Sequence, residues 1–249
     1  MYYDSHCHIY SEYYSDIDSL INDLANNDVK LLINNGCDMN SNKEVMSYIG
    51  KYPIMYGALG IHPENVNSYT NNDLLYIESN LANSKILAIG EIGLDYHYSK
   101  DDREKQISLF EAQLAMAERN NIPVIVHSRE ATKDTIDTLN KYNVRGIIHS
   151  FSGSYETAMI YIKKGFFLGI NGVITFKNSN LKDTIKKIGP EYITIETDSP
   201  YLTPHPFRGE KNSPKNVKII VKYLADLFEI SEEKMAKIVR DNLDKIFDI

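Results

Sequence analysis

ILAIGEIG (residues 86–93) and PVIVHS (residues 123–128) are short apolar runs of the kind that form buried strands, and a helical pattern separates them. The intervening segment is DREKQISLFEAQLAMAERN (residues 102–120), whose apolar residues recur at intervals of three and four. Its apolar stripe consists of Ile107, Phe110, Leu114 and Ala117. A strand, a helix and another strand in this order predict two parallel strands joined by a helical crossover.

The same unit repeats along the whole chain, with strand candidates spaced by roughly 25–30 residues. The eight predicted strands are residues 1–9, 29–36, 54–62, 86–93, 123–128, 145–151, 166–172 and 192–198. Seven of them precede a segment with a helical pattern, and the tail from Asn216 to Phe247 predicts two closing helices. Eight parallel strands in 249 residues favour an α/β fold, a (β/α)8 TIM barrel with extra C-terminal helices. A doubly wound open sheet is the alternative, because periodicity does not show whether a sheet closes.

Composition limits the kind of protein and its partners. No linker rich in Pro, Gly or Ser divides the chain, so we expect a single domain over residues 1–249. No apolar run approaches the roughly 18–20 residues of a membrane span, and the N-terminus carries no export signal. Two cysteines, Cys7 and Cys37, do not make a disulfide framework, which favours a cytoplasmic protein. The net charge of -7 argues against broad attraction to nucleic acids or anionic lipids, although bound cations can still serve a nucleic-acid substrate.

Residues that commonly bind metals recur at one end of the predicted strands. They are His6 and His8 in the first strand, His62 in the third, Glu91 in the fourth, His127 in the fifth, His149 in the sixth and Asp198 in the eighth. The carboxyl ends of barrel strands form one rim, where barrel enzymes carry their active sites. A single histidine is more often a packed, hydrogen-bonded residue than a ligand. Six strands that deliver such residues to one rim nevertheless predict a metal centre.

The first strand contains DSHCHI, in which two histidines flank a cysteine. Side chains two residues apart on a strand point to the same face, so His6 and His8 can point into the barrel while Cys7 points toward the helices. We therefore expect Cys7 to pack as a small apolar residue. Asp4 shares the face of His6 and could orient it, since ligating histidines usually have a hydrogen-bond partner.

Four histidines and two carboxylates are more than one divalent ion needs, and they suit two ions that share a bridging carboxylate. We expect His6, His8, Glu91 and Asp198 to bind one ion, and Glu91, His127 and His149 to bind the other. Two neighbouring ions activate a water molecule and stabilise both the attacking and the leaving oxygen. Asp198 could also act as the general base toward that water. The mixed nitrogen and oxygen set suits Zn, Mn or Co, and Mg is acceptable if a substrate phosphate completes its coordination.

Six motifs follow one another over nearly the whole chain. They are DSHCHIY, GIHPENV, IGEIGLDYHY, PVIVHSREA, IIHSFSGS and ETDSPYLTPHPFRGEKNSP. In this order they resemble the signatures of the TatD-type metal-dependent deoxyribonuclease family in the amidohydrolase superfamily; the HxH pair alone is weak, but IGEIGLDY together with ETDSPYL is specific. The resemblance implies a closed barrel, two divalent metal ions and hydrolysis of DNA phosphodiester bonds, as a 3′-5′ exonuclease. It also implies Glu91 where many superfamily relatives carry a carboxylated lysine, and the usual YLAP reads YLTP here.

The remaining candidates would hold the substrate. His62 lies outside both ligand sets, and we expect it to contact the scissile phosphate or to protonate the leaving oxygen, with packing as the alternative. Arg129 follows His127, and Arg208 lies in the loop after the last strand. Either guanidinium could anchor a phosphate, and exposure to solvent is the alternative for each.

Aromatic residues follow the first ligand pair. Tyr10, Tyr13 and Tyr14 could stack on the bases of a single strand, which is a sequence-tolerant way to hold DNA. Asp95 and Tyr96 are expected to orient the loop that carries Glu91. The expected partner is therefore a DNA substrate in single-stranded form, and no obligate protein partner is expected.

Two other functions fit the same residues. The first is a metal-dependent amide or ester hydrolase of the same superfamily, for example one that acts on a modified aminoacyl-tRNA, because an activated water serves all these bonds. Arg129, Arg208 and the aromatic loop favour a phosphodiester. The second is a metal-binding scaffold without catalysis, although a scaffold has no need of both the bridging Glu91 and the base Asp198.

Overall fold

An eight-stranded parallel sheet runs through the computed structural model, which describes residues 1–97 and 101–249. The strands are β1 (Tyr2–Cys7), β2 (Val29–Asn35), β3 (Met55–Leu59), β4 (Ile86–Asp95), β5 (Val124–Arg129), β6 (Gly146–Ile148), β7 (Phe166–Ile170) and β8 (Ile193–Ile195). Each strand pairs with the next in chain order, with no reversal of order. A doubly wound sheet requires such a reversal, so the barrel is confirmed and the open sheet was the wrong alternative.

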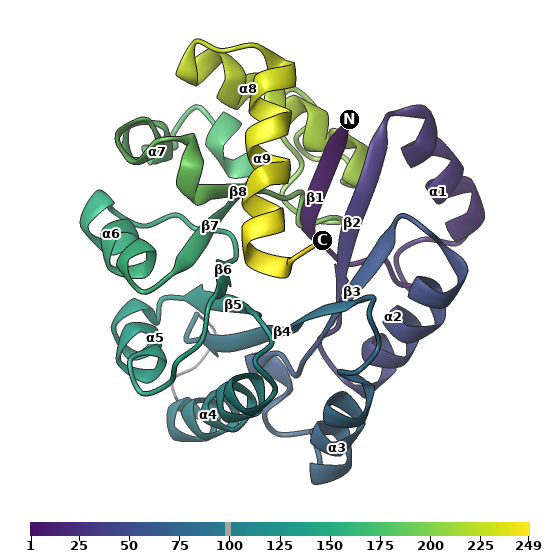
Figure 1. The fold of residues 1–249 in the computed structure, drawn as a ribbon, viewed down its shortest axis with the longest axis vertical. Helices are drawn as coiled ribbons and strands as arrows, with labels where there is room; N and C mark the ends of the chain where they lie inside the picture. Colours follow the sequence, from purple (N-terminus) through teal and green to yellow (C-terminus); the bar gives the residue numbers. More distant parts are fainter. Residues whose placement is uncertain (98–100) are drawn as a thin grey trace.

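Helices surround the sheet as an outer ring, except for the C-terminal helix, which crosses one end of the barrel (Figure 1). They are α1 (Ile17–Asn26), α2 (Met39–Lys51), α3 (Asn71–Asn80), α4 (Arg103–Asn120), α5 (Thr132–Leu139), α6 (Tyr155–Lys163), α7 (Leu181–Ile188), α8 (Val217–Phe228) and α9 (Glu232–Phe247). Short 3-10 helices lie at η1 (Pro63–Asn65), η2 (Gly172–Thr175), η3 (Pro190–Tyr192) and η4 (Pro214–Asn216). The first seven helices each follow the strand of the same number, and α8 and α9 are the two predicted C-terminal helices. In the part of the chain that the structure describes, no helix combines the length and the apolar character that crossing a membrane requires.

Hydrogen bonds outside the regular ladder join β1 to the segment after β8. Asp198 N donates to His6 O at 3.0 Å, and His8 N donates to Ser199 O at 2.7 Å. The carboxylate of Asp4 accepts from Thr197 N at 2.9 Å and from His6 N at 3.2 Å. The barrel therefore closes where the predicted metal ligands of β1 and of the segment after β8 lie, and these hydrogen bonds hold the two segments together.

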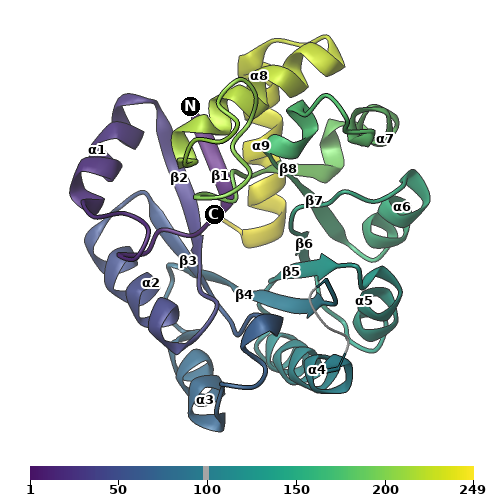
Figure 2. The ribbon, with the colours of Figure 1, turned by 180° about the vertical axis from the view of Figure 1, so that it is seen from behind.

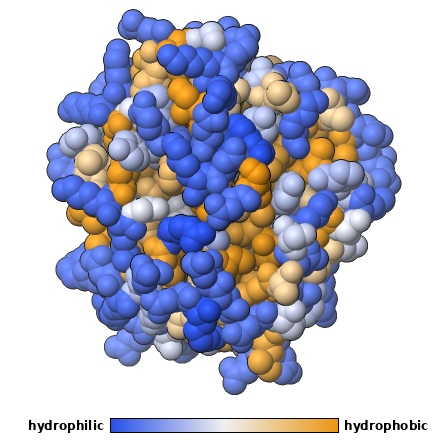
Figure 3. Space-filling view, in the orientation of Figure 1, coloured by the Kyte–Doolittle hydropathy of each residue, from blue (hydrophilic) through white to orange (hydrophobic). Residues whose placement is uncertain are grey.

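Helix α9 covers the amino-terminal end of the barrel. Asn242, which is fully buried, donates to Pro190 O at 2.9 Å and to Ile193 O at 2.8 Å, so α9 is fixed to the start of β8. This helix crosses in front of the strands in Figure 1 and lies behind them in Figure 2, where the connection from β8 to α8 is nearest the viewer. The surface of the α9 end is largely hydrophilic, with hydrophobic residues between the polar ones (Figure 3). The carboxyl ends of the strands open at the other end, which Figure 2 shows.

Two buried glutamines of α4 anchor segments at that open end. Gln106 accepts a hydrogen bond from Asp95 N and donates one to Asp95 O, both at 2.9 Å. Gln113 accepts from Ile61 N at 2.8 Å and donates to Ile61 O at 3.0 Å. The helix thus fixes the main chain beside His62 and at the end of β4, in addition to packing its apolar stripe on the sheet.

Gly146 allows β5 and β6 to approach closely. It opens β6 with φ of +156°, and a Cβ atom there would lie 1.8 Å from Val124 O, a main-chain atom that cannot move aside. We expect Gly146→Ala to lower the free energy of unfolding by about 3 kcal/mol, the upper end of ordinary overpacking. A thermal melt should then show a Tm lower by roughly 6–12 °C.

Gly50→Ala is the matched control for this substitution. Gly50 lies inside α2, and a Cβ atom there would meet nothing within 4 Å. Alanine stabilises a helix interior by up to about 1 kcal/mol relative to glycine, so this variant should melt at the same temperature as the parent or slightly higher. An unchanged Tm for Gly146→Ala would contradict the close approach of the two strands.

Candidate metal centre

The strand-end residues predicted from the sequence meet around one cavity of about 820 Å³. The residues of this set that line it are His8, His62, Glu91, His127, His149 and Asp198. His6 is fully buried beside them and contacts four of them, His8, Glu91, His149 and Asp198. The sequence prediction of a shared rim therefore matches the positions of all seven residues in the structure.

We expected Glu91 to end its strand, but β4 continues for four more residues, to Asp95. The pairing of β4 with β5 is irregular between Ile89 and Ile92, and Glu91 lies within this irregularity. Its side chain is buried and points toward the histidines of other strands. A break in the ladder lets a side chain inside a strand reach the same cavity as residues at strand ends.

One oxygen of Glu91 belongs to a group of four donor atoms. His6 Nε2 and His8 Nε2 are 3.1 Å apart, and each lies 3.4 Å from Glu91 Oε2. Asp198 Oδ1 lies 3.6 Å from the nitrogen of His6 and 3.5 Å from that of His8. Four ligands at about 2.1 Å from a tetrahedral ion are about 3.4 Å from one another. These five distances are close to that spacing, and His6, His8 and Asp198 by themselves form a group whose donor atoms all lie within 4.8 Å of one another.

The other oxygen of Glu91 faces a second group of histidines. Glu91 Oε1 is 2.8 Å from His127 Nδ1, 3.7 Å from His62 Nε2 and 3.8 Å from His149 Nε2. His149 Nε2 is also 3.7 Å from Asp198 Oδ1, so His149 lies between the two groups. His62, which we left out of the ligand sets, is as near to this oxygen as His149. A carboxylate whose two oxygens face two donor groups has the arrangement that a bridging ligand needs.

Two further carboxylates contact the ring nitrogens of His127 and His149 that do not face Glu91. Asp95 Oδ2 is 2.9 Å from His127 Nε2, and Glu196 Oε1 is 2.9 Å from His149 Nδ1. Carboxylates commonly contact the second nitrogen of a metal-binding histidine, where they fix the orientation of the ring. We expected Asp95 to orient the Glu91 loop, and the side chain contacts His127 instead. Glu196 was missed, although it lies only two residues before Asp198; both residues follow the end of β8 at Ile195.

Buried charges compensate one another in this cluster. Burial opposes ionisation of Glu91, but nearby His6, His149 and His62 outweigh it and hold the pKa of the carboxyl well below its usual range. Burial likewise opposes ionisation of Asp198, and His149 and His8 lower the pKa of that carboxyl nonetheless. Both carboxylates are therefore negative at neutral pH, as ligands of a divalent cation must be.

His62 has a defined proton position. Burial, reinforced by neighbouring His127, lowers the pKa of its imidazole to about 3, so the ring is neutral at neutral pH. Its Nδ1 accepts a hydrogen bond from Glu64 N at 3.2 Å. The single ring proton therefore sits on Nε2, the nitrogen that faces Glu91 and the cavity.

The remaining residues of the DSHCHI motif have structural contacts. Cys7 is fully buried and its thiol points to Ile33 O at 3.4 Å, away from the cluster, as strand alternation predicted. Asp4 bonds to the main chain of His6 and Thr197, so our expectation that it orients the His6 ring was wrong. Cys37, which no sequence pattern singled out, lines the cavity with its sulfur 3.8 Å from His8 Nδ1.

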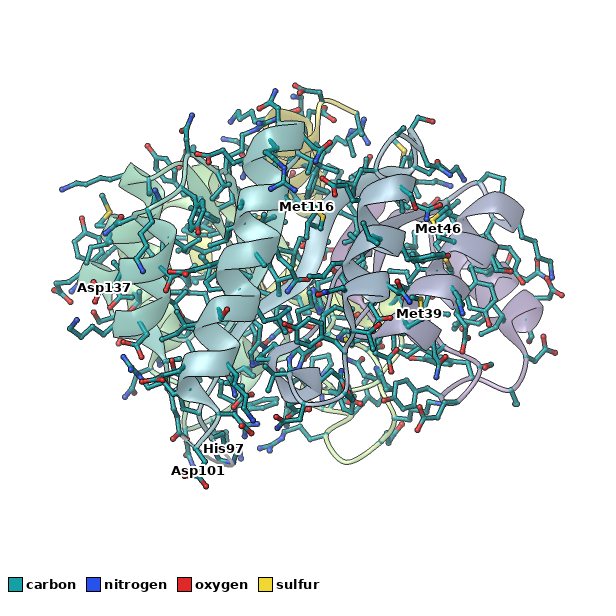
Figure 4. The ribbon with its side chains drawn as sticks, turned by 90° about the horizontal axis from the view of Figure 1, so that it is seen from below. Met39, Met46, His97, Asp101, Met116 and Asp137 are labelled. Carbon is teal, nitrogen blue, oxygen red and sulfur yellow. The ribbon has the colours of Figure 1, made fainter. Side chains whose placement is uncertain are left out.

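The predicted substrate residues separate into two groups. Arg129 ends β5 and lines the cavity. Arg208 stacks on Phe176, with its guanidinium carbon 4.0 Å from the ring centroid, and it is not among the described residues that line the cavity. His97, for which no role was predicted, lies at the edge of the molecule near Asp101 (Figure 4), where its Nδ1 is 2.7 Å from the carboxylate of Glu130. The structure therefore brings Arg129, but not Arg208, to the cavity.

Comparisons with known proteins agree over the full length. The family model "TatD related DNase" matches residues 3–248. YabD of Bacillus subtilis (strain 168), an uncharacterized metal-dependent hydrolase, is 37% identical over 254 residues that cover 100% of both chains. YcfH of Escherichia coli (strain K12), also an uncharacterized metal-dependent hydrolase, is 32% identical, with 99% of this chain and 95% of YcfH covered. The crystal structure of YjjV, a TatD homologue from Escherichia coli K12, superposes with a TM-score of 0.95 at 27% identity, covering 100% of this chain and 98% of YjjV.

Proposed function

Because this chain belongs to the TatD related DNase family of metal-dependent hydrolases, in the amidohydrolase superfamily, we propose that it hydrolyses DNA phosphodiester bonds with two divalent metal ions. The observation that carries this proposal is the position of Glu91, whose two oxygens face two separate groups of donors. A carboxylate in this position can bind one ion through each oxygen. The first ion would be held by His6, His8, Glu91 and Asp198, and the second by Glu91, His127 and His149.

The donors also limit the metal and its chemistry. Imidazole nitrogens with carboxylate oxygens suit Zn, Mn or Co, and Mg is acceptable when substrate phosphate completes its coordination. Two such ions, when bound, lower the pKa of water and neutralise charge on the phosphate. His62 remains available to the substrate, because its protonated Nε2 faces the cavity and can donate to a phosphate oxygen or to the leaving oxygen.

Asp198 is the candidate general base. Its carboxylate lines the cavity and is ionised, because the histidines around it lower its pKa. An ionised carboxylate at the floor of the cavity can accept a proton from an attacking water. Arg129 would bind a neighbouring phosphate of the strand, since a guanidinium matches phosphate oxygens in charge and geometry. Arg208 stacks on Phe176, so a substrate role for it would require a longer strand that leaves the cavity.

The shape of the site supports attack at a strand end. The donor atoms are buried at the bottom of a cavity in the barrel mouth, surrounded by the loops that follow the strands. A chain end enters such a cavity more easily than the middle of a duplex does. We therefore propose exonuclease action on single-stranded DNA in the 3′-5′ direction, with the direction taken from the family resemblance.

The charge of the mouth gives a specific reason to test a second function. Carboxylates of Glu12, Asp38, Glu44 and Glu64 line it, and Arg129 is the one lysine or arginine among the described lining residues. A neutral ester or amide would meet less repulsion there than a polyanion. An amide or ester hydrolase, for example one acting on a modified aminoacyl-tRNA, is therefore the second candidate.

One substrate panel separates these functions. The protein is stripped with EDTA, reloaded with Mn²⁺, Zn²⁺, Co²⁺ or Mg²⁺, and assayed on single-stranded DNA, duplex DNA, RNA and small esters. We expect metal-dependent shortening of single-stranded DNA from its 3′ end, and a block by a terminal 3′ phosphorothioate linkage. Rapid ester turnover with intact oligonucleotides would overturn the nuclease proposal in favour of the second candidate.

The free cysteines and the single-chain origin of the donor atoms bear on the location of the protein and on its partners. Cys7 and Cys37 are free thiols, which is usual in the reducing cytoplasm, so we propose a cytoplasmic location. We also propose that residues 1–249 act as one domain and need no protein partner for catalysis, since the donor atoms of both groups come from one chain.

A further inference from the structure

A pair of tyrosines stands at the mouth of the cavity, close to the candidate metal centre. Tyr13 belongs to the turn after β1, and Tyr201 follows Asp198, to whose carbonyl it donates its main-chain N–H at 2.8 Å. Both line the cavity. Tyr201 is 49% exposed, and the centroid of its ring is 6.3 Å from that of the His8 ring. An aromatic surface is therefore available within about one nucleotide of the proposed ligands.

The two rings hold each other in place. Their hydroxyls are 2.8 Å apart, and their centroids are 5.9 Å apart at an angle of 73°. Tyr10 supports Tyr13 from inside, with centroids 5.7 Å apart, and is itself buried with its hydroxyl bonded to Asn35 O. Tyr14, by contrast, donates its hydroxyl to Asn212 O at 3.0 Å and does not line the cavity. A fixed aromatic surface loses little entropy when a planar ligand stacks on it.

The charges around the tyrosine pair favour an uncharged group of the ligand over a phosphate at this position. Glu12 lies between Tyr10 and Tyr13 in the sequence, and the carboxylate of Glu44 accepts hydrogen bonds from Ser11. Because Glu12 and Glu44 both line the cavity, the β1 side of its mouth is acidic. Arg129 lies on β5, across the barrel from β1 (Figure 2). The phosphates of a DNA strand would be repelled by the acidic β1 side and attracted by Arg129 on the β5 side. The planar and uncharged part of a nucleotide, its base, is the part that suits the tyrosines.

We propose that Tyr13 and Tyr201 form a stacking site for the unpaired base next to the scissile phosphate, while the strand continues toward Arg129. The proposal rests on the proposed function for the identity of the bond that is cleaved. It explains how a cavity with an acidic mouth can bind DNA, because stacking on an aromatic ring does not depend on the charge of the phosphates. It also selects single strands, since a paired base has no free face for the ring.

The test uses two short single-stranded oligonucleotides that differ at the 3′ terminal residue. One ends in deoxyadenosine, the other ends in an abasic tetrahydrofuran residue, and both carry the same 5′ fluorophore. Binding is measured by anisotropy in EDTA, and KM is measured with Mn²⁺. The parent protein should prefer the base-bearing probe by roughly tenfold in both measurements, and Tyr201→Ala and Tyr13→Ala should reduce this preference to about one. Tyr201→Phe keeps the ring and should keep most of the preference.

Tyr192→Ala is the matched control. Tyr192 is 43% exposed, similar to Tyr201, but it lies in η3 before β8, at the opposite end of the barrel. It should retain the full preference for the base. Loss of preference in this variant, or its retention in both Tyr201→Ala and Tyr13→Ala, would overturn the stacking site. Base-dependent binding without hydrolysis would overturn the proposed function alone, and hydrolysis without base preference would overturn the stacking site alone.

Discussion

Replacement of Glu91 by glutamine is expected to lower kcat by on the order of 10³-fold and to reduce the metal content of the protein from the proposed two ions per chain to one or none. Glutamine fills nearly the same volume, so the barrel should remain folded. It offers one neutral oxygen where the native side chain offers two that share a negative charge. Since Oε2 faces His6 and His8, and Oε1 faces His127, an amide can serve at most one of the two groups.

The measurements are turnover of single-stranded DNA and the metal content of dialysed protein by mass spectrometry. Glu111→Gln is the matched control, because Glu111 lies on the outer surface of α4 and pairs with Lys141 at 2.6 Å. The same chemical change there should alter neither turnover nor metal content. Two tightly bound ions together with turnover near that of the parent protein in Glu91→Gln would remove the bridging role.

The barrel could be predicted because its signal is local and repeated. Parallel strands buried on both faces are continuous apolar runs, and β4 is buried along its whole length. The end of β4 could not be read in the same way, since the irregular pairing around Glu91 depends on β5. The closure of the barrel was equally inaccessible, because it depends on contacts between Asp4 and Thr197, far apart in the sequence.

The candidate site was predictable where residue type and strand alternation acted together. The motif comparison with TatD-type enzymes was confirmed by the family match over residues 3–248. Asp95 and Glu196 could have been proposed as partners of the site from residue type and spacing, since Asp95 lies four residues after Glu91 on β4 and Glu196 lies two residues before Asp198. Cys37 and Arg208 carried no such signal, because both belong to loops. The position of Arg208 depends on how its proline-rich loop brings it onto Phe176.

Asp198→Asn is expected to lower kcat by about 10³-fold to 10⁴-fold while both ions remain bound. Asp198 has a positive φ of 54°, a conformation that asparagine adopts as readily as aspartate. Its main-chain bonds to His6 and Tyr201 do not involve the side chain, so the fold and the tyrosine pair should be preserved. An amide oxygen can still face His6 and His8, but it cannot take up a proton.

Loss of turnover with retained metal distinguishes the role of Asp198 from that of Glu91. Loss of turnover together with loss of metal, as expected for Glu91→Gln, indicates that the carboxylate is needed to bind metal, whereas loss of turnover with the metals retained indicates that Asp198 acts as a base in addition to contributing an oxygen to the first ion. Without its base, the variant depends on hydroxide from the solvent, so its residual rate should rise steadily with pH in a range where the parent rate is level. Turnover within tenfold of the parent protein, or a pH profile of the parental shape, would assign the proton transfer to another group.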